Sequence, residues 1–216
     1  MVYNLADGYS TRHLYFRAYF YLPSATLLGS SHANEWQKFI AIFSSGGEAR
    51  NAGQSAWVHF GAYPTQASPI VHSTDFGLTF TPDVAAPGTN VRTQYPGIVT
   101  PDVWHIIEIE VYAVDGVNDI MRVWLDKDAR YDTPDFDHTG AYFSTDANVK
   151  FDKVEINWNW IGWNGDAWSG LERPYSQYFW DHFAASETGA IGDTVGLLDG
   201  PAPPTYYGRF GTLFPR

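Results

Sequence analysis

The chain has 216 residues, which suits one large all-β domain, because sandwiches of roughly 200 to 250 residues often stay undivided. Its 24 acidic residues outnumber 13 basic ones, and the formal net charge of -11 argues against nucleic acid and anionic membrane surfaces as partners. There is no cysteine, which excludes disulfides and thiolate chemistry, and no apolar run reaches the ~20 residues needed for membrane insertion.

The first strand signal covers residues 14–22. Apolar side chains there alternate with Tyr15, Arg17, Tyr19 and Tyr21, and a period of two places alternate residues on opposite faces of a sheet. One face is therefore apolar, and the other is aromatic and charged.

Later segments continue the strand pattern. We expect strands at 39–43, 56–62, 76–81, 103–113, 120–126, 151–160 and 176–185, with 103–126 forming a hairpin and 82–101 a long surface loop. With 20 Gly and 13 Pro the composition favours strands joined by turns over a helix bundle. We predict one domain over 1–199 and a Pro-rich C-terminal arm over 200–216.

Aromatic residues are abundant, with 9 Trp, 14 Tyr and 14 Phe. The C–H patches of pyranose rings stack on aromatic faces, while sugar hydroxyls need fixed donors and acceptors nearby. This pattern predicts a carbohydrate-binding groove. Its candidate ligand-binding residues are Tyr15, Arg17, Tyr19, Glu110, Arg122, Trp124, Asn157, Asn159 and Trp163.

Glu108 and Glu110 are candidate catalytic carboxylates. They are two residues apart on one strand, so they share a face about 6 to 7 Å apart. The alternative is a solvated face in which they pair with Arg122 on the neighbouring strand. A lyase would instead need a base, for which His59, His105 and Tyr19 are the candidates, although a buried structural role is the simpler interpretation of both histidines.

The segment 157–168 is the most distinctive, because it holds four tryptophans among asparagines and glycines. Each tryptophan is either a core anchor for the loop or an exposed platform for sugar. We expect Trp163 to be exposed.

Three stretches resemble the concanavalin A-like lectin/glucanase superfamily, in particular its polysaccharide-lyase-like and laminin-G-like branch. They are 14–23, the hairpin strands 104–111 and 122–126, and the closing segment 178–186. The resemblance implies an antiparallel jelly-roll β-sandwich of two packed sheets with long loops. It also implies an N-terminal strand that pairs with the closing strand, although little sequence precedes Leu14.

The resemblance bears on two candidate sites. Hydrolase branches carry Glu-x-Asp-x-Glu on a strand, and 108–110 lacks the third acid. The closing strand usually carries two acidic residues, and His182 follows Asp181 here, which leaves Asp181 as a weak metal candidate. A structural calcium ion at Asp181, or among the aspartates of 126–137, remains an expectation.

The leading functional hypothesis is a carbohydrate-binding jelly roll that recognises a polysaccharide or glycan on a concave aromatic face. One alternative is an endo-acting polysaccharide lyase or glycoside hydrolase in the same groove. A second is a structural or adhesion domain of a virion or cell-surface assembly, in which the arm holds a homo-oligomer together. We expect an extracellular or surface-displayed protein whose leader is absent from this numbering.

Overall fold

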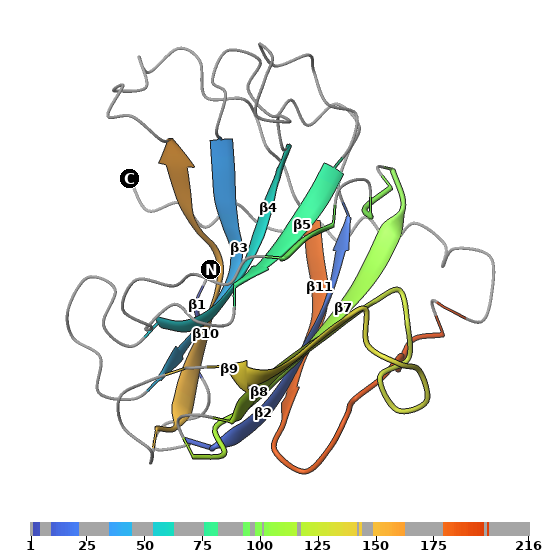
Figure 1. Cartoon of the computed structure of the whole chain (residues 1–216). Helices are drawn as coiled ribbons and strands as arrows, with labels where there is room; N and C mark the ends of the chain where they lie inside the picture. The colour runs from blue at the N-terminus through green and yellow to red at the C-terminus, as the bar shows by residue number, and fades with distance from the viewer. Residues whose placement is uncertain are drawn as a thin grey trace.

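A computed structural model shows two antiparallel β-sheets packed face to face (Figure 1). It describes residues 2–4, 10–21, 35–44, 54–62, 76–81, 93–95, 98–100, 102–115, 118–141, 143, 149–162, 179–196 and 198. Side chains are described for the larger part of these residues, but not for 2–4, 35–39, 44, 54–62, 76–81, 93–95 and 157–162. Every described element is a strand, and the described residues include no helix that could cross a membrane.

The strands divide into a six-stranded and a five-stranded sheet. The first runs in the order β1 (Val2–Asn4), β10 (Phe151–Gly162), β3 (Glu35–Ser44), β4 (Gln54–Ala62), β5 (Phe76–Thr81) and β6 (Thr93–Tyr95). The second runs in the order β11 (Phe179–Ser186), β2 (His13–Tyr21), β7 (Trp104–Tyr112), β8 (Asp119–Leu125) and β9 (Phe136–Ala141). The predicted all-β, antiparallel sandwich is confirmed.

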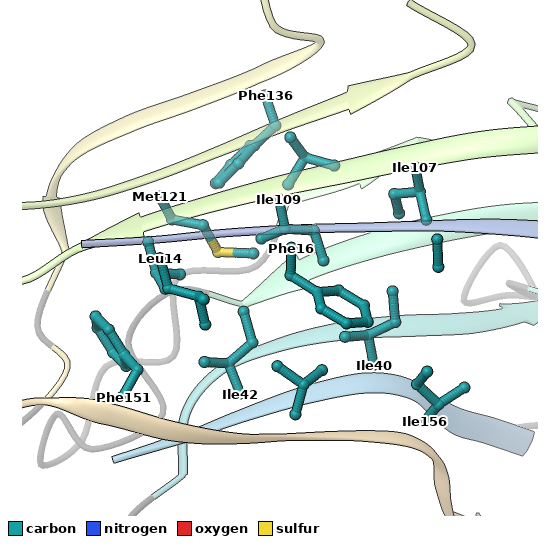
Figure 2. Close-up of a cluster of buried hydrophobic side chains, with 14 of the residues drawn as sticks. Leu14, Phe16, Ile40, Ile42, Ile107, Ile109, Met121, Phe136, Phe151 and Ile156 are labelled. Carbon is teal, nitrogen blue, oxygen red and sulfur yellow. The ribbon is translucent and has the colours of Figure 1, made fainter. Parts of the chain in front are cut away.

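The core lies between the two sheets, and Figure 2 shows side chains of both sheets meeting there. The apolar set of β2 is fully buried, as its alternation predicts, and burying each large side chain contributes about 1.5 to 3 kcal/mol. The buried cluster includes Leu14, Phe16, Ile107, Ile109 and Met121 from the five-stranded sheet and Ile40, Ile42, Phe151, Val154 and Ile156 from the six-stranded sheet.

The two sheets differ in regularity. β2 pairs with β7, and β7 with β8, without a register shift, so Arg17 lies opposite Glu108 and Glu110 lies opposite Arg122. The register shifts at two places between β10 and β3, one of them between Ile156 and Asn159, and at two places between β3 and β4. Irregularities of this kind bend a strand, and the five-stranded sheet has them only in its outer pairs, β11 with β2 and β8 with β9.

Three strands were not predicted: β1, β6 and β9. β6 falls in 82–101, which we expected to be a loop, and a strand of three residues is too short to show a period. A short N-terminal strand is present although little sequence precedes Leu14, but it departs from the pattern of the resembled superfamily, because β1 pairs with β10 while the closing strand β11 pairs with β2. The arm at 200–216 lies outside the described residues and stays a prediction.

His105 fastens the start of β7 to the end of β8. Its buried ring stacks on Phe20, with 5.1 Å between the centroids. Nε2 lies 2.7 Å from the Thr100 carbonyl and Nδ1 lies 2.6 Å from an Asp126 carboxylate oxygen. Both partners accept, so both ring nitrogens donate and the ring is an imidazolium. Burial lowers the pKa of His105, but the Asp126 carboxylate more than offsets this and leaves the pKa raised.

We expect the stability of the protein to depend on pH through His105. Because its pKa is raised in the folded state, the contribution is fully present below the unfolded value of about 6.5 and is lost as pH rises through the folded value. Asp126→Asn should flatten this dependence and lower the free energy of unfolding by about 1 to 3 kcal/mol near pH 6. Urea unfolding between pH 5 and 9 measures both effects, and an unchanged slope in the variant would contradict the assignment.

Candidate functional site

The predicted ligand-binding residues do not share one surface. Tyr15, Arg17, Tyr19, Glu110, Arg122 and Trp124 lie on the outward face of the five-stranded sheet, whereas Asn157 and Asn159 lie in β10 of the six-stranded sheet. The sheets pack through their apolar faces, so their outward faces point away from each other. The side chains of Asn157 and Asn159, and the whole of Trp163, lie outside the described residues.

A segment that follows β11 crosses the outward face of the five-stranded sheet (Figure 1). We call residues 191–196 the strap. The backbone N–H groups of Ile191 and Gly192 each donate to the Glu108 carboxylate at 2.7 Å. Arg17 donates to the Gly192 carbonyl at 2.8 Å and to the Thr194 hydroxyl at 2.6 Å. The strap therefore covers the centre of the predicted groove, and Glu108 has an exposed fraction of 0%.

Tyr19 is also held by the strap. Its hydroxyl donates to Asp193 at 2.6 Å, and only 3% of the residue is exposed. Asp193 also accepts the N–H groups of Val195 and Gly196, each at 3.0 Å, which closes a tight turn. Burial and the bond to Asp193 raise the pKa of Tyr19 to about 12, so this phenol is a donor and not a base. The expected exposed position of Tyr19 is wrong.

Trp124 is covered by the segment 126–135. Its Nε1–H donates to the Asp132 carbonyl at 2.8 Å, and 5% of the residue is exposed. The same segment contacts the strap, because Arg130 donates to the Asp193 carbonyl at 3.2 Å. Gly192 has a φ of +68°, and a Cβ at that position would clash with Asp128 and Arg130. The expected exposed position of Trp124 is therefore also wrong.

The acidic side chains of this region have partners within the protein. Asp135 pairs with Lys127 at 2.5 Å, and Asp128 pairs with Arg130. Asp181 accepts the N–H of His182 at 2.8 Å. Among the described residues, no three His, Asp or Glu side chains are grouped as a metal ion would need. Calcium stays an untested prediction.

One end of this face holds a polar cluster, made by His13, Tyr15, Glu110 and Arg122. The Glu110 carboxylate accepts from His13 at 2.7 Å, from Tyr15 at 3.0 Å and from Arg122 at 3.1 Å. Burial raises the pKa of Glu110, but these donors outweigh it and the pKa is lowered. Three of the predicted ligand residues thus come together. His13, whose ring stacks on Tyr112 at 4.3 Å, was missed because it lies at the very start of β2.

The opposite end of the same face holds an aromatic row, made by Phe179, Tyr21 and Trp104. These residues are direct partners in register on β11, β2 and β7. Ring centroids are 6.0 Å apart between Phe179 and Tyr21, and 5.7 Å apart between Tyr21 and Trp104. Phe179 is 43% exposed. The strap therefore separates two partly open ends of one sheet face.

The outward face of the six-stranded sheet carries a different group. In β10, Val154 and Ile156 enter the core, so Lys153 and Glu155 point outward. Lys153 Nζ lies 3.0 Å from Glu155 Oε1 and 4.0 Å from the ring centroid of Phe43. Glu155 is only 7% exposed, and its Oε2 is buried without a hydrogen-bond partner. One oxygen of this carboxylate therefore has a donor and the other has none, on a face that the core does not occupy.

Comparison with known proteins agrees on the fold. No protein-family model matches the chain, and no curated protein sequence does. Alginate lyase Aly36B, solved with an alginate trisaccharide, matches 83% of this chain over 72% of its own, with a TM-score of 0.53 and 12% identity. An alginate lyase from Pseudomonas aeruginosa matches 83% of this chain over 68% of its own length, with a TM-score of 0.50 and 10% identity. The chain has the concanavalin A-like jelly-roll fold, as its sequence resemblance implied.

Replacing Glu108 tests the attachment of the strap. Glu108→Ala leaves the N–H groups of Ile191 and Gly192 without their acceptor and Arg17 as a buried cation without its opposite carboxylate. Breaking a buried charge arrangement of this kind costs about 3 to 5 kcal/mol. Urea unfolding should show this loss, and amide hydrogen exchange should accelerate at both strap residues.

A matched control is Glu187→Ala, because Glu187 is exposed in the turn after β11. It should change the free energy of unfolding by no more than about 0.5 kcal/mol. If the strap amides of Glu108→Ala exchange their hydrogens at the same rate as those of the control, the strap is not held by this carboxylate.

Proposed function

We propose that this protein binds a polysaccharide on the outward face of the six-stranded sheet. The observation that carries the proposal is Glu155, a buried carboxylate on that face whose Oε2 has no hydrogen-bond partner. A buried acceptor without a donor costs roughly 1 to 3 kcal/mol, and more when it is charged. A sugar hydroxyl is a donor of the right kind, so a saccharide would remove that cost once the Glu155 side chain turns its buried oxygen toward solvent.

The neighbours of Glu155 suit the same ligand. Lys153 keeps 33% of its side chain exposed, so its ammonium can donate to a sugar oxygen while it stays beside Glu155. Phe43 lies under that ammonium and fixes the lysine stem by a cation–π contact. Asn157 follows Glu155 in the same strand, and the tryptophan-rich segment 157–168 begins there. This combination of fixed polar groups beside aromatic residues is typical of sugar-binding surfaces.

The fold supports a polysaccharide-related role. The structurally similar proteins include alginate lyases solved with an alginate trisaccharide and an alginate tetrasaccharide. The five-stranded sheet offers less room for such a chain, because the strap covers its centre. A polymer outside the cell is the natural ligand of such a domain, so we retain an extracellular or surface location as part of the proposal, together with assembly through 200–216.

The second candidate function is a polysaccharide lyase, and the observation that favours it is the ammonium of Lys153. Abstraction of a proton next to a uronate requires that the uronate carboxylate be neutralised, and a partly exposed ammonium can do this. A hydrolase using Glu108 and Glu110 has less support. Glu108 is sealed under the strap, and Glu110 is held by three donors on the other sheet.

Glu155→Gln tests the proposed site. The amide keeps the size of the side chain and an oxygen that can accept from Lys153, but it removes the negative charge. We expect binding to fall about tenfold, as for the loss of one charge-assisted hydrogen bond, while the melting temperature stays within a few degrees. Isothermal titration against alginate, xylan and mixed-linkage β-glucan measures the effect on whichever of these polymers the wild type binds.

Glu187→Gln is the matched control, since it removes one exposed carboxylate without touching this face. Equal affinities for wild type and Glu155→Gln would refute the site. Absorbance near 235 nm reports unsaturated products. An absorbance that rises when the wild type is incubated with alginate, and does not rise with Lys153→Met, would support the lyase.

A further inference from the structure

We propose that the aromatic row of Phe179, Tyr21 and Trp104 is a second carbohydrate-binding site, specific for single chains of neutral sugar. It lies on the opposite side of the sandwich from Glu155. The proposal rests on the proposed function only in taking a saccharide as ligand. The two sites share no residue, so each can fail alone.

The pairing of the strands places the three side chains of the row next to one another. The three residues are direct neighbours on β11, β2 and β7, so their side chains are fixed side by side across the sheet. Ring contacts of 6.0 and 5.7 Å hold them further. A ligand therefore meets rings that are already in place and loses little binding energy in ordering them.

Solvent reaches this row. Phe179 is 43% exposed, and Tyr21 and Trp104 are only partly buried. Val103, which precedes Trp104, is also exposed. Large apolar side chains gathered on an outward sheet face are a feature of binding surfaces, because single exposed aromatics are normally scattered.

The polar groups around the row select the class of ligand. The Tyr21 hydroxyl donates to Asp102 at 3.4 Å, and Asp181 extends from β11 two residues beyond Phe179. Carboxylates accept hydrogen bonds from sugar hydroxyls but repel uronates and sulfated sugars. The net charge of -11 acts in the same direction. A neutral polysaccharide is therefore the complementary partner.

The tilt of the rings selects the form of the polymer. Trp104 is inclined to Tyr21 by 53°, and Phe179 is inclined to Tyr21 by 65°. A flat crystalline surface would need coplanar rings, whereas a corrugated row can follow the twist of one chain. Soluble single chains should therefore bind, and crystalline cellulose should not.

The experiment uses the full chain with soluble xylan, glucomannan and mixed-linkage β-glucan as neutral probes and alginate as the anionic probe. Phe179→Ala and Trp104→Ala should each weaken binding of a neutral polymer about tenfold in affinity electrophoresis. Tyr131→Ala is the matched control, because Tyr131 is an 82% exposed aromatic residue that is not part of the row. Glu155→Gln should keep the binding that the row provides.

Three results would overturn the proposal. The first is that Phe179→Ala binds every neutral polymer as tightly as the wild type does. This variant should fold, because the Phe179 ring is exposed. The second is that the wild type binds alginate and that both row variants lose more affinity for alginate than for the neutral polymers. The third is a dimer of the wild type that Phe179→Ala dissociates, since a second copy would then occupy the row. Loss of binding in Glu155→Gln with wild-type binding in the row variants would support the proposed function and reject the row.

Discussion

Arg17 and Glu108 lie opposite each other in register on the outward face of the five-stranded sheet, and the hydrogen bonds that bury them determine what covers the centre of that face. Two charged residues buried at the centre of a sheet face are costly unless each finds several partners. The strap supplies them: two N–H groups for the carboxylate, and a carbonyl and a hydroxyl for the guanidinium. The two charged side chains thus hold the strap in place, and the strap in turn supplies the hydrogen bonds that offset the cost of burying them. Because the strap crosses the middle of the face, the polar cluster and the aromatic row stay open at the two ends.

Local alternation predicted the described strands other than β1, β6 and β9, because a period of two reports which side chains share a face. It could not report what covers that face. Arg17, Tyr19 and Trp124 were correctly placed on the outward side, yet segments 191–196 and 126–135 lie over them. The bond from Ile191 to Glu108 joins residues 83 positions apart, and no periodic signal marks it. The run Gly192-Asp193-Thr194 was the available hint, since such residues build turns capped by an aspartate.

The sequence pattern also could not predict which of the two sheets each strand joins. Asn157 and Asn159 were grouped with Tyr15 and Arg122 because alternation predicted outward positions for all four, but β10 pairs with β1 and β3 and not with β2 or β8. Outward positions define one surface only when their strands are neighbours, and strand order depends on contacts far apart in sequence. The register within the hairpin of β7 and β8 was predictable for the opposite reason, because a short turn fixes it.

The two outward faces differ in charge, and this difference bears on how an acidic domain could meet a polysaccharide. Repulsion from a net charge of -11 is screened beyond about 8 Å at physiological ionic strength, so the groups within a few ångströms of the ligand decide the outcome. Beside Glu155 the nearest such group is the ammonium of Lys153, which tolerates an anionic sugar. Tyr21 of the aromatic row instead donates to the Asp102 carboxylate, and Asp181 follows Phe179 by two residues on β11, so this end of the face carries carboxylates that repel an anionic sugar. A domain with both faces occupied would therefore hold two chemically different chains on its opposite sides, and the sandwich itself would set the distance between them.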